Sequence, residues 1–221
     1  MNGRLEPESS RPTMARSPLF ARTDESRDDL FYASARLVEH IDARAIAEVE
    51  RLHRERIAPN ADVLDLMSSW VSHLPGDVEY KSVTGLGMNA VELARNPRLT
   101  RSVVHDLNAN PRLPFDDASF DAAIVCVSIQ YLTDPVAVLR ELARVARPDA
   151  TLVITFSNRC FPTKAVAIWQ ATDDRGHLAL VSRYVTDAGG WTALETHAST
   201  GRGDPLFAVT ARRAKGVSCS S

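Results

Sequence analysis

After residue 60, short apolar segments alternate with polar or helical stretches, and this alternation is the feature that most constrains the fold. The segments are VLDLM, SVTGL, SVVH, AAIVCVSI, TLVITFS and LFAVTA. Apolar runs of this length, bounded by polar sequence, are typical of buried strands. The alternation therefore predicts an α/β domain built on a largely parallel sheet.

The clearest helix is predicted over residues 134–147, with the sequence DPVAVLRELARVAR. Asp134 can cap its N-terminus, Pro135 fits the first turn and Pro148 follows the end. The predicted buried stripe consists of Val138, Leu139, Leu142 and Val145. Because TLVITFS follows at once, strand, helix and strand are expected to form a right-handed crossover between neighbouring parallel strands.

Apolar residues recur at helical spacing over residues 28–57, which predicts one or two helices forming an N-terminal lid. Residues 1–27 and 213–221 lack such periodicity, so we expect both to be flexible tails. Residues 28–212 are then expected to form a single domain, since 221 residues suit one core.

The composition favours a small-molecule partner. A formal charge of -2 creates no field that would steer the chain to nucleic acid or to anionic lipid. The most apolar stretch, residues 122–129, is far shorter than the roughly 20 residues of a membrane helix, and no signal-peptide core is visible, so a cytoplasmic protein is expected. The three cysteines have no metal-ligand spacing, which predicts free thiols and no metal site. The oligomeric state is left open.

One segment, residues 105–156, carries an ordered series of motifs. They are Asp106, Leu113-Pro114-Phe115, Asp117, Ser119-Phe120-Asp121 and Asp134-Pro135. This series resembles the class I S-adenosylmethionine-dependent methyltransferases, specifically the small-molecule branch called type 11. The resemblance covers about residues 60–160, and more weakly the rest to residue 212. It implies a Rossmann-like, mostly parallel seven-stranded sheet with helices on both faces.

The loop after the first strand departs from that family. Residues 63–66 match the family's first strand, whose usual continuation is D-x-G-x-G-x-G, so Met67, Ser69 and Val71 stand where glycines usually stand. Glycine lets the backbone approach the methionyl part of the cofactor and adopt angles that are costly for other residues. A positive φ at β-branched Val71 would be strained, so we expect this turn to follow another path.

A second departure lies at the end of the second strand. Residues 83–89 align with V-x-G-x-D-x-S, which places Gly87 where an acidic residue normally binds the two ribose hydroxyls. The separation from Asp65 to Gly87 is close to the roughly 20 residues expected of this fingerprint. Asn89, two residues on, could offer one amide to the ribose.

Other positions keep features of a cofactor site. The resemblance implies that Asp106 accepts a hydrogen bond from the adenine amino group and that Leu107 supplies a backbone amide and an apolar cover. Ser68 and Ser69 can present hydroxyls and amides near the helix expected next, whose N-terminus favours a carboxylate. The resemblance also places Asp65, Met67 and Cys126 along the methionyl chain. Packing alone would equally explain Cys126.

Tyr32, Arg36 and His40 are spaced by four residues, so a helix would place them on one face. In related methyltransferases an N-terminal aromatic or basic residue often closes over the cofactor carboxylate, and the planar guanidinium of Arg36 suits that role. The alternative is a solvated helix face. We therefore assign Tyr32 and Arg36 to the cofactor site as a hypothesis.

Three residues are candidates for binding the methyl acceptor. Arg159 and Lys164 follow strand five at the sheet edge where ligands bind, and they either contact an acidic acceptor or cap loop carbonyls. Tyr131 stands near a position where the family often has histidine, and it retains a hydroxyl. His73 and His105 are the candidates for a general base, although a structural role is expected for each. No catalytic residue is assigned.

Two functions follow from this pattern. The first is an S-adenosylmethionine-dependent methyltransferase that acts on an unidentified small molecule. The second is a degenerate relative that binds another ligand or serves as an interaction subunit. Retention of Asp106 and of the 105–156 pattern favours the first, and the loss of the glycines and of the ribose acid favours the second.

Overall fold

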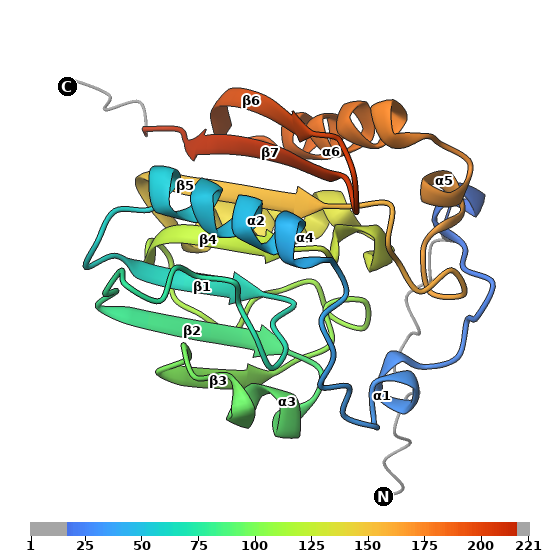
Figure 1. Cartoon of the computed structure of the whole chain (residues 1–221), viewed down its shortest axis with the longest axis horizontal. Helices are drawn as coiled ribbons and strands as arrows, with labels where there is room; N and C mark the ends of the chain where they lie inside the picture. The colour runs from blue at the N-terminus through green and yellow to red at the C-terminus, as the bar shows by residue number, and fades with distance from the viewer. Residues whose placement is uncertain (1–16, 216–221) are drawn as a thin grey trace, which may run out of the picture.

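The computed structural model describes residues 17–215, which contain a seven-stranded sheet of order β3-β2-β1-β4-β5-β7-β6 (Figure 1). The strands are β1 Asp62–Leu66, β2 Ser82–Gly87, β3 Arg101–Val104, β4 Phe120–Cys126, β5 Ala146–Phe156, β6 Trp191–Ser199 and β7 Leu206–Arg213. The first five pair in parallel, and β7 runs antiparallel between β5 and β6. The predicted Rossmann-like, mostly parallel sheet is confirmed.

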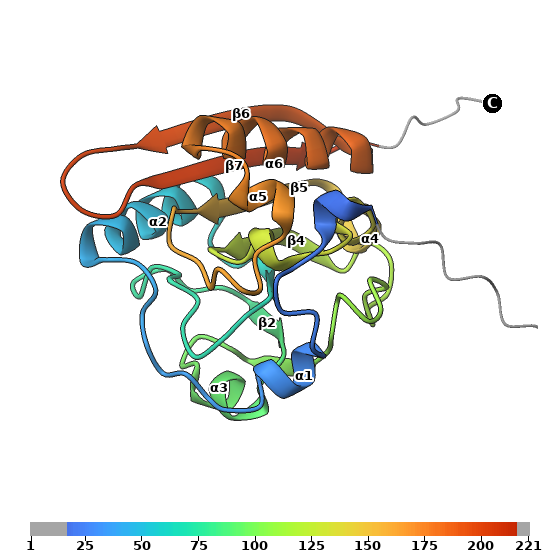
Figure 2. The same cartoon turned by 90° about the vertical axis from the view of Figure 1, so that its right-hand side faces the viewer.

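Helices cover both faces of this sheet (Figure 2). They are α1 Asp28–Phe31, α2 Ala43–Arg56, α3 Ala90–Arg95, α4 Pro135–Val145, α5 Ala167–Gln170 and α6 Asp174–Ala188. Helix α2 contacts β5 and β7 on one face, while α4 and α6 pack together on the other. None of the described helices is long and apolar enough to cross a membrane.

Helix α4 confirms the predicted crossover. The Asp134 side chain caps it by accepting a hydrogen bond from the Ala137 amide at 3.0 Å. The four residues of its predicted stripe are all fully buried, in the same core cluster as Leu152 and Ile154 of β5. Burying each such side chain contributes roughly 1.5–3 kcal/mol. The helix ends at Val145, and β5 follows directly.

The connection from β1 to β2 differs from the prediction. Residues 67–81 form an irregular loop, so the helix expected beside Ser68 and Ser69 is absent from this part of the chain, and that prediction is wrong. Two serine hydroxyls of the loop donate to Asp65, which gives the segment an alternative to helical hydrogen bonding. Pro75 disfavours helical conformation in the residue before it.

The N-terminal region also departs from the prediction. The expected helical lid consists of α1 and α2 joined by the non-helical residues 32–42. Residues 17–27, predicted as part of a flexible tail, pack against the domain, since Arg22 is buried and forms a β-bridge with Val166. Residues 1–16 and 216–221 lie outside the described chain. Arg213 belongs to β7 and donates to the carbonyl of Ala143, so the predicted C-terminal tail begins too early.

Candidate functional site

A cavity opens where the parallel strands end, and residues of the non-helical segment 32–42 line it. This segment runs past that end of the sheet on its way from α1 to α2 (Figures 1 and 2). It has an empty volume of about 1200 Å³, its open mouth included. All ten residues predicted to bind the cofactor line this cavity, and so does Tyr131. Arg159 and Lys164 do not. The structure thus brings most of the predicted site together, while the ligand of each residue stays a prediction.

The β1 loop is organised around Asp65. The hydroxyls of Ser68 and Ser72 each donate to Asp65 Oδ2 at 2.6 Å. Met67 takes a positive φ of 59°, while Val71 is not among the residues with positive φ. The positive φ therefore falls on Met67, whose side chain is not β-branched, and not on Val71. The turn thus follows a different path from the glycine loop, as the sequence predicts.

Gly87 and this loop are structurally coupled. A Cβ atom at Gly87 would lie 2.1 Å from the backbone oxygen of Ser68, a distance that no side chain tolerates. The loop lies this close because the Ser68 amide donates to the Leu86 carbonyl at 2.8 Å. The path of the β1 loop therefore leaves no room for a side chain at position 87.

Both polar atoms of the Asn89 side chain form hydrogen bonds within the protein. Its Oδ1 atom caps α3 by accepting from the amides of Val91 and Glu92, and its Nδ2 atom donates to the carbonyls of Tyr32 and Ala33. A ribose contact by Asn89 would compete with these bonds. The side chain instead fastens segment 32–42 to the end of β2.

Glu92 is a site residue that sequence reasoning missed. One carboxylate oxygen accepts from the Arg36 amide at 2.7 Å, and the other accepts from the Ser69 hydroxyl at 2.6 Å. The Trp70 indole also donates to the Val38 carbonyl at 3.1 Å. These bonds close segment 32–42 against the β1 loop. The partners lie far apart in the chain, so no local pattern could have identified them.

Tyr32, Arg36 and His40 do not share a helix face, because the chain is non-helical between α1 and α2. All three nevertheless line the cavity. The spacing argument was therefore wrong about the geometry, although the residues lie at the expected place. Their backbone is held by α3 and by the β1 loop instead of by helical hydrogen bonds.

Asp106 and Leu107 follow β3 at the cavity. Asp106 is half-buried, and its Oδ1 atom accepts from the amides of Asn108 and Ala109 at 2.9 and 3.1 Å. Leu107 is buried in the main core and lines the cavity. The carboxylate has further acceptor capacity beyond these two bonds, since two oxygens offer about four lone-pair sites.

The predicted acceptor residues separate into two groups. Tyr131 lines the cavity, accepts from the Phe161 amide at 2.9 Å, and has its pKa raised to about 12 by burial. Arg159 is exposed and pairs with Asp204 at 2.8 Å. Lys164 is fully buried, where its ammonium lies 3.1 Å from Asp28. Neither Arg159 nor Lys164 lines the cavity, and each pairs with a carboxylate of the protein, so this geometry does not support their predicted contact with the acceptor.

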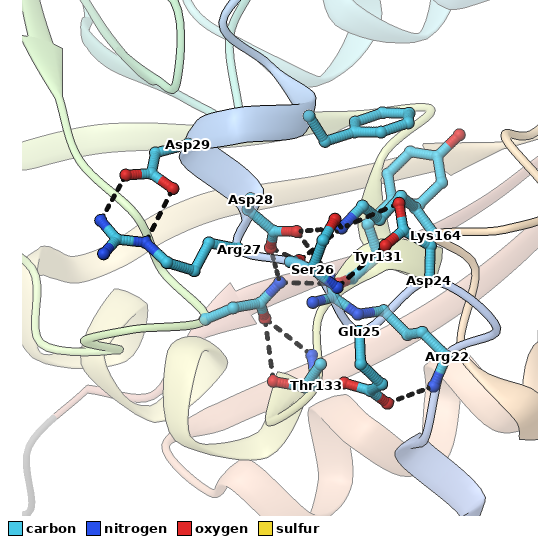
Figure 3. A network of polar contacts seen from close by, with 12 residues as sticks. Arg22, Asp24, Glu25, Ser26, Arg27, Asp28, Asp29, Tyr131, Thr133 and Lys164 are labelled. Atoms are coloured by element: carbon cyan, nitrogen blue, oxygen red, sulfur yellow. Dashed lines mark hydrogen bonds and ion pairs between the residues drawn. The ribbon is translucent and has the colours of Figure 1, made fainter.

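A buried polar cluster ties the N-terminal segment to the site (Figure 3). Asp28 accepts from Arg22 at 2.8 Å and from Asn108 at 2.8 Å, and it pairs with Lys164. Asn108 also donates to the carbonyl of Tyr131 at 3.0 Å. Burial raises the pKa of Asp28, but the hydrogen bonds from Arg22 and Asn108 outweigh it, so the net pKa is lowered. We call Arg22, Asp28, Asn108 and Lys164 the Asp28 cluster.

The buried carboxyl of Asp65 predicts a pH dependence of stability. Burial raises its pKa from 3.8 to about 6, against the opposing hydrogen bonds from Ser68 and Ser72. Between about pH 4 and pH 6 the folded protein keeps a proton that the unfolded chain has released, so this group lowers stability as the pH rises. Asp65→Asn removes this pH dependence. As the pH rises from 4 to 7, the free energy of unfolding of the variant should increase by up to ~3 kcal/mol relative to that of wild type.

Urea denaturation of both proteins across this pH range measures the difference. Asp62→Asn is the contrasting variant, because the hydrogen bond from Lys81 lowers the pKa of Asp62 to about 2. It should lose stability relative to wild type at neutral pH. A constant offset between Asp65→Asn and wild type at every pH would show that the carboxyl of Asp65 is not perturbed.

The comparisons with known proteins bear on this geometry. The model of a family described as "Methyltransferase domain", of type 11, matches residues 69–154. A solved S-adenosylmethionine-dependent methyltransferase from Aquifex aeolicus is 19% identical with a TM-score of 0.56, covering 78% of this chain and 94% of that one. The chain therefore has the class I methyltransferase fold, and its residues 69–154 match the type 11 methyltransferase domain. The sequence resemblance is thereby confirmed.

Two further similar proteins carry different names. The [4+2]-cyclase SpnF is 16% identical with a TM-score of 0.58, covering 82% of this chain and 89% of that one. A demethylmenaquinone methyltransferase of Mycobacterium sp. (strain KMS) is 46% identical over 56 residues, which is 24% of this chain and 24% of the relative. The match thus spans about a quarter of that curated protein.

Proposed function

We propose that this protein binds S-adenosylmethionine in the cavity and transfers its methyl group to a small molecule. The observation that supports this most directly is the cavity itself. It lies at the carboxyl edge of a methyltransferase-fold sheet, and it joins Asp106 and Leu107 to the β1 loop. Ligands of open α/β sheets bind at this edge.

The residues present fit the adenine end of the cofactor better than the ribose. Asp106 has acceptor capacity left, and Leu107 offers an apolar surface beside it. The ribose has no carboxylate at position 87, because the loop leaves no room for a side chain there. The cavity therefore fits the cofactor through the residues at its adenine end and through segment 32–42, which encloses it.

When bound, S-adenosylmethionine supplies a methyl group already made electrophilic by the sulfonium. The protein's own residues then have to position the acceptor and to exclude water. Segment 32–42 excludes water, because hydrogen bonds with Asn89, Glu92 and Trp70 hold it across the cavity. Partial burial lowers the pKa of His40 and of His73, which disfavours the charged form of both imidazoles beside the cavity.

Isothermal calorimetry with S-adenosylmethionine and S-adenosylhomocysteine tests the cofactor assignment. We expect both to bind in a one-to-one ratio. Ligand at 100 times its dissociation constant should also stabilise the protein by ~2.7 kcal/mol in a thermal-shift titration. If neither compound binds, the proposed function is wrong.

The second candidate is a protein that keeps the fold without transferring a methyl group. The rearranged β1 loop and the filled space at Gly87 favour it, and SpnF shows that a protein named as a cyclase shares this fold. Release of S-adenosylhomocysteine from labelled cofactor, measured with mixtures of candidate acceptors, separates the two. Binding with no transfer to any acceptor would favour this second function.

A further inference from the structure

One end of the cavity has an aromatic wall formed by Tyr32, Tyr131 and Phe161. Tyr32 follows α1, Tyr131 ends the short 3-10 helix after β4, and Phe161 lies in the loop after β5; all three line the cavity. The rings of Tyr131 and Phe161 have centroids 5.9 Å apart, and the ring of Phe31 packs on both Tyr32 and Phe161 at 4.9 and 5.6 Å. Flat aromatic surfaces of this kind favour a flat ligand.

Arg36 lies within this wall. Its guanidinium carbon is 4.5 Å from the centroid of the Phe31 ring and 5.5 Å from that of Phe161. The Nη2 atom donates to the Phe31 carbonyl at 2.9 Å, whereas Nη1 is buried and has no hydrogen-bond partner within residues 17–215. A buried donor on a cation is costly when it is left unpaired. The free Nη1 therefore indicates a ligand with an anionic acceptor.

Ser128 provides a second, independent indication. It follows β4, lines the cavity and is only 8% exposed, and its Oγ atom is buried without a partner among the described residues. Buried hydroxyls are nearly always hydrogen-bonded, so an unpaired hydroxyl on a residue that lines a cavity is informative. Ser128 and Arg36 come from separate segments, yet both leave a polar group unsatisfied in the same cavity.

The position of Arg36 separates it from the proposed cofactor contacts. Its backbone amide is bonded to Glu92 of α3, beside the β1 loop, but its side chain extends to Phe161, in the loop after β5. Asp106 and the β1 loop, which the proposed function gives to the cofactor, lie at the ends of β3 and β1. The aromatic wall is thus left for the acceptor.

We infer that the methyl acceptor is a planar ring compound with an anionic oxygen, an inference that rests on the proposed function. The aromatic wall binds its ring, and Arg36 and Ser128 bind its anionic oxygen. A guanidinium stacked among aromatic rings suits this class, because it offers planar donors to an oxyanion while its faces remain packed. The oxyanion is a ring carboxylate or a phenolate. Both present the same acceptor to Nη1.

Simple probes test this in the protein saturated with S-adenosylhomocysteine. Benzoate should bind about tenfold or more tightly than benzamide, which has the same ring but no charge, and than cyclohexanecarboxylate, which has the charge but no flat ring. 4-Nitrophenol reports a phenolate by its absorbance. Its bound form should ionise at a lower pH than its free form, since a nearby cation favours the charged state.

Arg36→Met should weaken benzoate binding about 10- to 100-fold and abolish the shift in 4-nitrophenol ionisation. Arg36→Lys should keep part of both effects. Arg159→Met is the matched control, because Arg159 is an exposed arginine outside the cavity, and it should leave both unchanged. Ser128→Ala is a milder variant that should weaken binding of both anions severalfold without removing a charge.

A comparison of cofactor fragments distinguishes the acceptor from the cofactor carboxylate. S-adenosylhomocysteine carries that carboxylate, and 5′-methylthioadenosine lacks it. If Arg36 binds the acceptor and not the cofactor carboxylate, Arg36→Met should affect the binding of both compounds equally. A selective loss of S-adenosylhomocysteine, with benzoate binding unchanged, would assign Arg36 to the cofactor and overturn the inference. So would a wild-type protein that binds S-adenosylhomocysteine but no planar anion, and in that case the proposed function would stand.

Discussion

Asp28→Ala is expected to lower the free energy of unfolding by about 3–5 kcal/mol. The substitution leaves the guanidinium of Arg22, which is 8% exposed, without its carboxylate, and it leaves the fully buried ammonium of Lys164 with only the more distant carboxylate of Asp24, at 3.4 Å. An uncompensated buried charge is more costly than the ion pair is stabilising. Urea denaturation at pH 7, analysed by linear extrapolation, measures the loss.

Asp29→Ala is the matched control for this prediction. Asp29 is the next residue in the chain and also pairs with an arginine, but its partner Arg27 is 80% exposed. Exposed ion pairs contribute at most about 1 kcal/mol, so this variant should stay close to wild type. Equal effects of the two substitutions would show that the Asp28 cluster does not stabilise the N-terminal segment.

The effect of Asp28→Ala should depend on pH in a defined direction. The pKa of Asp28 lies below its ordinary value of 3.8, so its stabilising effect is complete above that pH and is lost as the pH falls through the lowered value. The gap between wild type and Asp28→Ala should therefore persist from pH 7 down to about pH 4 and shrink only in stronger acid.

The Asp28 cluster also connects stability to the site. Asn108 lies two residues after Asp106 and bonds both to Asp28 and to the carbonyl of Tyr131. Thr133 donates to Asn108 through its amide and its hydroxyl. The proposed adenine loop and the aromatic wall are thus held by the same side chain. Disruption at Asp28 should consequently weaken ligand binding at both ends of the cavity.

The sheet and α4 could be predicted because their signals are local. Apolar runs mark buried strands, and the stripe of α4 recurs at the period of a helix with its cap and proline in place. Strand β6 gives no such signal, because its residues are mostly exposed and do not alternate. The seventh strand was accordingly expected only from the family resemblance.

The non-helical lid could not be predicted, because distant residues determine its backbone. Spacing by four describes one face only if the segment is a helix, and here the carbonyls of Tyr32 and Ala33 bond to Asn89 while the Arg36 amide bonds to Glu92. These tertiary bonds override local propensity. The contact of Ser68 with Gly87 is equally non-local, although both departures from the family pattern were visible in the sequence.

Lys164 shows why a charged residue near a predicted site is ambiguous. Its place after β5 suited an acceptor contact, but its ammonium turns instead to Asp28 and to the carbonyl of Ser26 at 2.7 Å. The partner segment, residues 17–27, has no apolar periodicity, so its packing against the domain could not be predicted. The Asp28 cluster holds this segment in place, and the residues of such a cluster do not recur at a regular spacing in the sequence.

Asp106→Ala is expected to weaken S-adenosylhomocysteine binding about 10- to 100-fold, because it removes the charge-assisted hydrogen bond that we propose to the adenine amino group. The same side chain also accepts from the amides of Asn108 and Ala109, so alanine would disturb the loop as well. Asp106→Asn separates these effects, since its amide oxygen can keep the two loop bonds while the charge is lost. We expect an intermediate loss of affinity, and calorimetry measures both variants.

The control for this prediction is Asp116→Ala, which removes an exposed carboxylate outside the cavity and should not change binding. If Asp106→Ala binds S-adenosylhomocysteine as tightly as wild type, adenine lies elsewhere and the alignment of β3 with the family is misleading. If Asp106→Asn matches wild type while Asp106→Ala is weak, Asp106 acts by shaping the loop that also carries Asn108. Only a graded loss across the two variants indicates that the carboxylate itself binds the purine.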